Sequence, residues 1–446
     1  MLGYRVTETV SRPPSESLLM TNQVQSTKLP NGLTVLTEHM AGLRSVTAGI
    51  WLRHGSRHES PELNGISHFI EHAVFKGTRR RTARDIANES DRLGGHIDAY
   101  TSHEMTGFAM KVVDTALPQA FDLLSDMLLS PRFDEEDLQR ERKVIIEEMK
   151  MIEDTPDEFL AERFNAAYFP DHALGRPIEG TAETVSSFDK KKITAFHARG
   201  YAAANLVIAA AGNVEHERLA EMAARAFGET ADESDTDADS IATQAIPVSA
   251  APILIERKTE LEQAHLILAT PWPSARSDDR YAASMLASLI GGGTSSRLWQ
   301  SIREERGLAY SIGAGGNTYS DVGIFNIYAG ASPGQLDEVL DLSLLELRRI
   351  VRETVAVEEL NLVKQQAISS ILLSLESTSS RAGALARQEI VHGRRISPEE
   401  IINKVEVVTP EDIRRVAEES FNTETVALGA LGNLNGFHVD RARLEI

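Results

Sequence analysis

Two histidines and a glutamate fall within five consecutive residues of the segment 64–78, NGISHFIEHAVFKGT. If this segment is a helix, His68, Glu71 and His72 share one face, because residues i, i+3 and i+4 stack at 3.6 residues per turn. Imidazole nitrogens suit Zn²⁺, and two of them on successive turns can fill two corners of a tetrahedron. Glu71 then remains available as a base toward a water molecule. Alone, the pattern fits a solvated helix face about as well as a metal site, so a third ligand must decide.

The acidic segment 135–153, EEDLQRERKVIIEEMKMIE, is the place to look for that third ligand. A catalytic zinc takes three protein donors and keeps a further position open for water. Glu141, Glu147 and Glu148 are the candidates on this predicted helix. One step along a helix turns a side chain by about 100°, so Glu147 and Glu148 cannot both face one ion. The residue types alone do not choose between them.

HFIEH, followed 76 positions after His72 by the Glu148 of ERKVIIEEM, resembles the pitrilysin family of zinc peptidases. The order H-x-x-E-H is the inverzincin form of a zinc-peptidase motif. The resemblance is with the short, two-domain branch, which includes the β subunit of the mitochondrial processing peptidase. It extends over nearly the whole chain, from about residue 27 to residue 433.

The resemblance implies a role for each residue of the two segments. His68, His72 and Glu148 match the ligands of one Zn²⁺ per chain, and Glu71 matches the general base. Glu141 matches the carboxylate that holds a ligand histidine in place, which ligating imidazoles generally need.

The second half of the chain contains a further pair of family residues. In the family, an arginine and a tyrosine seven residues apart reach across the clamshell to the substrate at the metal, and Arg303 and Tyr310 match them. Physically, a guanidinium and a phenol could grip the substrate backbone and stabilise the oxyanion of a tetrahedral intermediate. The alternative is that Arg303 pairs with a nearby glutamate and Tyr310 is a core residue. If the pair acts on substrate, the chain needs no second type of catalytic subunit.

Residues 95–101, GHIDAYT, resemble the family's active-site edge strand. Such a strand takes an extended peptide through backbone hydrogen bonds, so we expect His96, Asp98 and Ala99 to lie along the substrate. Many relatives have Asn where this chain has Asp98, which leaves the contact of that residue open.

Three further residues match substrate contacts of the processing peptidases. Phe75 matches an apolar side chain that lines the pocket just beyond the scissile bond, with a place in the core as the alternative. Glu158 and Glu162, four residues apart on a predicted helix, match acids that bind a substrate arginine in the mitochondrial relative. Their alternative is an ordinary solvated helix face.

A chain of 446 residues exceeds a comfortable single core and predicts two domains of about 200 residues each. We expect a loose N-terminal arm at 1–26, a catalytic zinc domain at 27–227, an acidic linker at 228–250 and a C-terminal homologous domain at 251–446. The linker sequence contains six acidic residues and almost no large apolar ones, which is typical of a segment without a core.

Composition narrows the class of protein. The absence of cysteine fits a reducing cytoplasm, and no apolar run is long enough to predict a membrane span. The N-terminal segment lacks a signal-peptide pattern and mixes acids with its arginines, unlike an organellar transit peptide. We therefore expect a bacterial-type cytoplasmic protein. A net charge of −20 argues against nucleic-acid binding and would attract cationic peptides, although many proteins are acidic for solubility alone.

The predicted elements indicate an α+β fold rather than alternating βαβ units. Strands are expected at 34–38, 45–53, 96–101, 106–113 and 205–211. Helices are expected within 64–78, ending near Gly77, and at about 82–93, 116–129, 134–153, 157–168, 186–197 and 215–227.

The pattern recurs after the linker with an offset of about 220 residues, which indicates two copies of one unit. Segment 188–214 parallels 410–434, and segment 135–149 parallels 357–371. We therefore predict two similar sheet-plus-helices domains that form half of a clamshell. The second copy has lost the metal residues: at the positions of His68, Glu71, His72 and Glu148 stand Ser284, Ala287, Ser288 and Ser370.

The sequence thus favours a zinc-dependent endopeptidase that cleaves unfolded or extended peptides. Two domains build only half of the four-domain chamber of the long relatives, so we expect a homodimer or a heterodimer with a homologous subunit. The alternative is a non-catalytic peptide-binding or assembly subunit of the same family, in which the zinc ligands are generally eroded. Zinc-assisted hydrolysis of a small ester or phosphate would leave Arg303, Tyr310 and the edge strand unexplained.

Overall fold

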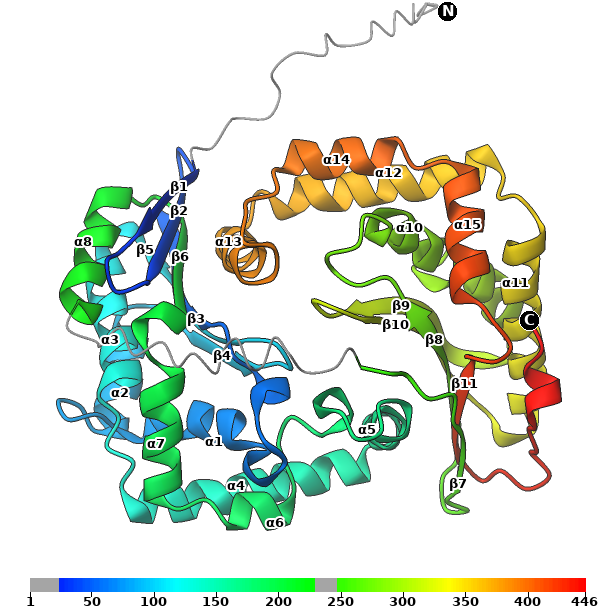
Figure 1. Ribbon diagram of the computed structural model, residues 1–446, viewed down its shortest axis with the longest axis horizontal. Coiled ribbons are helices and arrows are strands. Elements are labelled where there is room, and N and C mark those ends of the chain that lie inside the picture. The colour runs from blue at the N-terminus through cyan, green and yellow to red at the C-terminus, as the bar shows by residue number, and fades with distance from the viewer. Residues whose placement is uncertain (1–23, 229–246) are drawn as a thin grey trace, which may run out of the picture.

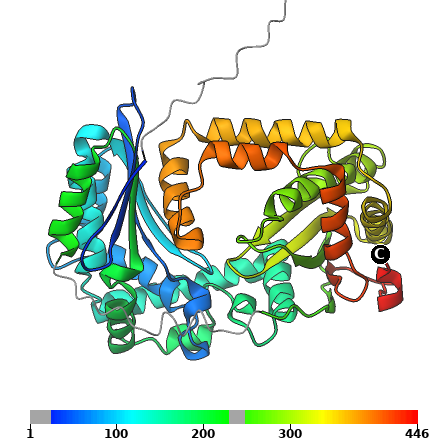
Figure 2. The ribbon, with the colours of Figure 1, turned by 45° about the horizontal axis from the view of Figure 1, so that its top comes forward.

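The computed structural model describes residues 24–228 and 247–446. Two lobes, each a β-sheet with helices packed on it, stand side by side in Figure 1. Figure 2 shows two helices, α12 and α14, lying along each other at one end of the molecule, while α4 and α5 run between the lobes at the other end. These four helices are α4 (Glu135–Asp154), α5 (Pro156–Tyr168), α12 (Val357–Ser374) and α14 (Pro398–Glu406).

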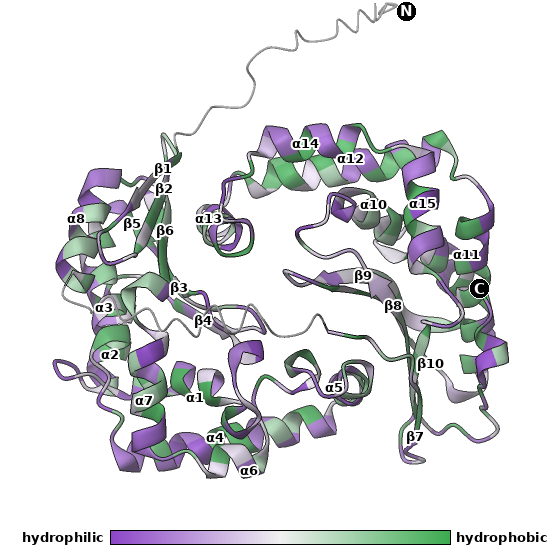
Figure 3. Ribbon diagram, in the orientation of Figure 1, coloured by the Kyte–Doolittle hydropathy of each residue, from purple (hydrophilic) through white to green (hydrophobic). Residues whose placement is uncertain are grey.

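The N-terminal sheet has six strands in the order β1-β2-β6-β3-β5-β4. Neighbouring strands are antiparallel except β2 and β6, which are parallel. The sequence of β6, LVIAAAG, is apolar (Figure 3). All seven of its residues are buried. β4 pairs only with β5, so one edge of β4 offers unpaired backbone groups. The strands are β1 (Val24–Lys28), β2 (Thr34–His39), β3 (Ser45–Leu52), β4 (Ile97–Thr101), β5 (Thr106–Val113) and β6 (Leu206–Gly212).

Helices cover one face of this sheet and bury the N-terminal core against it. Ile50, Phe108 and Leu124 are fully buried members of that core. The helices are α1 (Ile66–Ala73), α2 (Ala83–Arg92), α3 (Leu117–Leu129), α6 (Ala182–Ser186), α7 (Lys190–Gly200) and α8 (His216–Phe227).

The C-terminal sheet has five strands in the order β7-β11-β8-β10-β9. Its strands are β7 (Ile253–Arg257), β8 (Ala264–Trp272), β9 (Ala309–Thr318), β10 (Gly323–Ala331) and β11 (Ala427–Gly432). Its own helices include α10 (Arg280–Gly291), α11 (Leu336–Arg352) and α15 (Pro410–Ser420).

The two sheets share one pairing scheme. β7 runs parallel to β11 as β2 does to β6, and the three remaining pairings, through β8 and β10 to the edge strand β9, are antiparallel as in the first sheet. α10 contacts α12 as α1 contacts α4. The α+β fold with two similar domains that the sequence predicts is therefore confirmed.

One helix of each lobe packs on the sheet of the other lobe. α5 packs on β8 and β11 of the C-terminal sheet, with Phe164 in a cluster that includes Ile267 and Leu431. α13 (Thr378–His392) packs on β2, β3 and β6 of the N-terminal sheet and is seen end-on beside them in Figure 1. At this contact the guanidinium of Arg381 donates to both carboxylate oxygens of Glu38 at 2.6 to 3.0 Å, and both residues are buried.

Several predicted boundaries need correction. β1 begins at Val24, so the last part of the expected arm 1–26 is wrong: Val24 to Ser26 pair with β2. The helix expected near 186–197 is α7, which begins later, at Lys190, because Asp189 accepts a hydrogen bond from the backbone N–H of Lys192 and caps it; the separate helix α6 ends at Ser186. The rest of the arm and most of the linker lie outside the described residues. Among the described helices, none combines the length and the apolarity needed to cross a bilayer.

We predict that Glu38→Gln lowers the free energy of unfolding by about 3 kcal/mol, because it leaves the buried Arg381 without a counter-charge. Chemical denaturation measures the loss. Arg44→Gln removes an ion pair whose arginine is 78% exposed and serves as the control, with little expected change. Equal effects of the two substitutions would contradict a structural role for the Glu38 pair.

Candidate metal centre

α1 is a short amphipathic helix that turns its histidines toward α4. Its apolar side is buried in the N-terminal core, where Phe69 packs edge-on against Phe188 with 5.7 Å between ring centroids. This packing fixes the rotation of the helix about its axis. The opposite side carries His68, Glu71 and His72, all half-buried.

His68, His72 and Glu148 meet between α1 and α4. One candidate ligand atom of each lies within 4.8 Å of the others. His72 Nε2 is 3.5 Å from Glu148 Oε2, and the two imidazole centroids are 4.7 Å apart. The buried Nδ1 of His68 has no hydrogen-bond partner within the described residues. Two imidazoles and a carboxylate are a donor set that zinc accepts, so these residues fit the ion.

Glu147, the other glutamate considered for this role, faces away from the cluster. Its carboxylate forms an ion pair with Lys150 at 2.7 Å, and its side chain is 69% exposed. The turn of about 100° between neighbouring helix positions separates it from Glu148.

Glu141 lies behind His72, where the family resemblance places it. Its Oε2 is 3.4 Å from His72 Nδ1, and its Oε1 is 2.8 Å from Lys76 Nζ. Burial disfavours the charge on Glu141, but the contacts with His72 and Lys76 prevail and lower its pKa. An ionised Glu141 can accept a hydrogen bond from the Nδ1–H of His72, which leaves Nε2 free to bind a metal.

Glu71 lies beside the cluster with its carboxylate oriented by β4. Thr101 Oγ1 donates to Glu71 Oε2 at 2.7 Å. Burial, and to a smaller extent the nearby Glu148, raises the pKa of Glu71 above its ordinary value. Thr101 was not predicted from the sequence, because nothing in the strand pattern distinguishes it from its neighbours.

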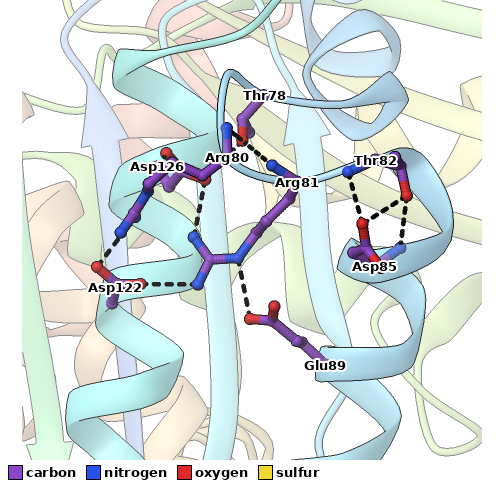
Figure 4. A network of polar contacts seen from close by, with 8 residues as sticks. All are labelled: Thr78, Arg80, Arg81, Thr82, Asp85, Glu89, Asp122 and Asp126. Atoms are coloured by element: carbon purple, nitrogen blue, oxygen red, sulfur yellow. Dashed lines mark hydrogen bonds and ion pairs between the residues drawn. The ribbon is translucent and has the colours of Figure 1, made fainter.

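The segment that follows α1 is tied to α3 by a polar network (Figure 4). Thr78 Oγ1 donates to Asp126 Oδ2 at 2.6 Å, and Arg80 and Arg81 donate to the same buried carboxylate. Burial raises the pKa of Asp126, but the hydrogen bonds from Thr78, Arg81 and Arg80 outweigh it and lower the pKa below its ordinary value. The segment that follows the C-terminal end of α1 is thereby fixed to the core.

The residues expected to touch substrate at β4 lie along its free edge. Asp98 is exposed, and His96 is exposed just before the strand begins. Ala99 and Phe75 are half-buried and pack against the N-terminal core. For Phe75 this contact accords with the alternative of a core residue.

Glu158 and Glu162 lie on α5, beyond the end of α4. Glu158 is exposed, whereas burial and the nearby Glu179 and Glu153 raise the pKa of the half-buried Glu162 to about 7. A hollow of about 550 Å³ lies beside Glu162. Its charged lining consists of two basic and four acidic residues: Lys150, Arg163, Glu153, Glu162, Glu179 and Glu256. Burial and the charge of Glu148 raise the pKa of Glu179, a residue the sequence gave no reason to single out.

Arg303 and Tyr310 lie in the other lobe. Arg303 is in a π-helical turn (Trp299–Glu304), and its guanidinium lies over the rings of Trp299, at 4.0 Å, and Tyr310, at 5.3 Å. Tyr310 is 78% exposed at the start of the edge strand β9, so it is not a core residue. Among the described residues, neither side chain contacts the metal cluster.

Comparison with known proteins identifies the family. The sequence profile described as insulinase (peptidase family M16) matches residues 34–182, and that of the peptidase M16 inactive domain matches residues 187–367. A protein of Streptomyces coelicolor named an uncharacterized zinc protease is 38% identical over 89% of this chain and 87% of its own length.

The chain belongs to peptidase family M16. A Bacillus subtilis protein with the same kind of name is 36% identical over 90% of the chain and 96% of its own length. The pitrilysin-type, two-domain form inferred from HFIEH and ERKVIIEEM is thus confirmed.

Solved structures of M16 proteins share the fold. A protease from Helicobacter pylori superposes with a TM-score of 0.83 at 22% identity, covering 92% of this chain and 99% of that one. A peptidase M16 inactive domain from Pseudomonas fluorescens gives 0.84 at 19% identity, covering 92% and 98%. A chain of complex III2 from Candida albicans gives 0.80 at 19%, covering 95% and 100%.

We predict that Glu141→Gln weakens zinc binding by about 10- to 100-fold, because the His72 imidazole loses the carboxylate that orients it. Competition with a chromophoric chelator measures the dissociation constant. Glu147→Gln on the exposed side of the same helix is the control and should bind zinc as the unaltered protein does. An unchanged affinity in Glu141→Gln would show that the contact does not support the site.

Proposed function

We propose that this chain is a zinc-dependent endopeptidase for unfolded or extended peptides. The observation that carries the proposal is the meeting of His68, His72 and Glu148, with Glu71 beside them, at the free edge of β4. The names of the M16 relatives support zinc as the metal and proteolysis as the reaction.

Zinc bound at this site would polarise a peptide carbonyl and lower the pKa of a water molecule. Glu71 takes the proton from the attacking water and returns it to the leaving amine. Its raised pKa makes the carboxylate a better proton acceptor than an exposed glutamate. Thr101 holds one carboxylate oxygen and leaves the other for water.

An extended peptide would bind by adding a strand to β4. Its backbone would pair with the free edge formed by residues 97–101, with His96, Asp98 and Ala99 along its path. The acidic hollow that includes Glu162, with Glu158 nearby, suits a basic side chain of the substrate.

Arg303 and Tyr310 support a dimeric enzyme. The turn between β9 and β10 contacts the N-terminal lobe, where the Ser320 hydroxyl donates to Glu104. Tyr310 lies at the other end of β9, eight residues from Thr318, which at the rise of a strand separates the two residues by up to roughly 27 Å. Tyr310 is exposed and Arg303 is half-buried, and among the described residues neither contacts the candidate metal cluster of its own chain. We propose that the working enzyme is a homodimer or a heterodimer with a homologous subunit.

We predict that Glu71→Gln keeps zinc but reduces peptide cleavage to the level of the metal-free protein, because no base remains to take the proton. A quenched peptide library, assayed with and without chelator, measures cleavage, and elemental analysis measures zinc. Normal cleavage by this variant would remove Glu71 as the base. If the zinc-loaded unaltered protein cleaves no peptide, a non-catalytic assembly role is favoured. If it cleaves only small esters or phosphates, and a chelator stops this cleavage, zinc-assisted hydrolysis of small molecules is favoured instead.

Tyr310→Phe is expected to lower kcat by about 100-fold with a smaller effect on KM, as loss of an oxyanion donor does. Tyr328→Phe, which removes the hydroxyl hydrogen-bonded to His265 in the same lobe, is the matched control. Similar kcat values for the two variants would place Tyr310 outside the catalytic machinery.

A further inference from the structure

α1 begins at a residue that cannot cap it. Gly65 has φ of +93° and no side chain, so the first-turn N–H groups of the helix need an acceptor from elsewhere. Packing excludes a side chain there, because a Cβ on Gly65 would lie 2.4 Å from the carbonyl oxygen of Glu179. The usual N-cap residues Ser, Thr, Asp and Asn therefore cannot occupy this position.

Glu59 supplies the missing acceptor. Its Oε2 accepts a hydrogen bond from the Gly65 N–H at 2.7 Å, and its Oε1 accepts one from the Ser67 N–H at 2.8 Å. The side-chain amide of Asn64 donates to Oε2 at 3.4 Å. Ser67 immediately precedes His68, so the carboxylate is joined to the backbone beside the first histidine of the cluster.

Burying the carboxylate of Glu59 at this position costs free energy. Glu59 is 2% exposed, and its carboxylate forms no ion pair within the described residues. The guanidinium of Arg176 donates to the backbone carbonyl of Glu59 and not to its carboxylate. Burial raises the pKa of Glu59 to about 7, although the hydrogen bonds from its three neighbours oppose the shift. Helices elsewhere in the chain are capped without a buried charge, as Thr82 caps α2. An uncharged acceptor can thus cap a helix in this chain, so capping alone does not explain why the acceptor at α1 is a buried carboxylate.

Its location distinguishes Glu59 from the other support of α1. Thr78 and Asp126 hold the segment after the helix, beyond His72. Glu59 instead holds the turn that contains His68, where a small rotation would move the imidazole away from the other two ligands. The carboxylate also lies at the positive end of the helix dipole.

We propose that Glu59 is a positioning residue for the metal centre, which fixes the first turn of α1 so that His68 points toward His72 and Glu148. The inference rests on the zinc site proposed above. Glu59 touches neither metal nor substrate, so its effect should fall on metal affinity and on coordination geometry.

The test compares Glu59→Gln with Glu38→Gln at pH 8, where Glu59 is ionised. Glutamine has the same size, but its amide oxygen replaces only one of the two acceptors. Glu38 is equally buried, at 2% exposed, and binds Arg381 on the α13 side of the sheet, so its loss reports general destabilisation. Zinc dissociation constants come from chelator competition, and the visible spectrum of the Co²⁺-loaded protein reports the ligand geometry.

Glu59→Gln is expected to weaken zinc binding by about tenfold or more and to change the Co²⁺ spectrum. Glu38→Gln should leave both nearly unchanged while lowering the Tm. Unaltered affinity in Glu59→Gln, or an equal loss in both variants, would overturn the proposal. Should Glu59→Gln not fold, Glu59→Asp, which shortens the side chain and keeps the charge, is judged by the same criteria.

These readouts separate this proposal from the proposed function. An unaltered protein that binds zinc but cleaves no peptide refutes the peptidase and leaves the affinity comparison intact. An unaltered protein that binds no zinc overturns both.

Discussion

α1 has eight residues, too few to keep a helical conformation in water without support. Two imidazoles one turn apart converge on a metal only if that short helix is held from outside. Its buried side packs on the N-terminal core, the polar network of Asp126 fixes the segment beyond it, and Glu59 holds its first turn. The geometry of the candidate site depends on these supports, because Glu148, the third candidate ligand, comes from a different helix.

The lobes depend on each other in a similar way. α5 covers the C-terminal sheet and α13 covers the N-terminal sheet, so neither lobe has a complete core alone. The buried pair of Glu38 and Arg381 fixes one of these crossings. A chain built this way presents β4 and β9, one edge strand of each sheet, from lobes held in one relative position. Only the first lobe contains the residues of the candidate metal site; the second has the same scaffold and carries Arg303 and Tyr310.

The local features of the fold and the site could be predicted from the sequence. The spacing of His68, Glu71 and His72 follows from helical periodicity, and the capping box of Thr82 with Asp85 starts α2 where expected. β5 has the predicted bounds, since Phe108, Met110 and Val112 recur at every second position and so bury one face of the strand. The repeat, visible as a constant offset, predicted that the second domain copies the first.

Contacts between distant segments could not be predicted. Glu59 lies in a short irregular segment whose sequence has no periodicity, and its role depends on the left-handed Gly65 and on the packing of Glu179. The sequence of α13 does not reveal that this helix packs on the N-terminal sheet, because an amphipathic helix does not specify which sheet it covers.

The central claim is that His68, His72 and Glu148 bind one zinc ion. X-ray absorption at the zinc edge of the zinc-loaded protein tests it most directly. The account predicts one ion per chain with two imidazole nitrogens and oxygen as the remaining donors. An ion without two imidazoles, or the same spectrum after Glu148→Ala, would contradict it.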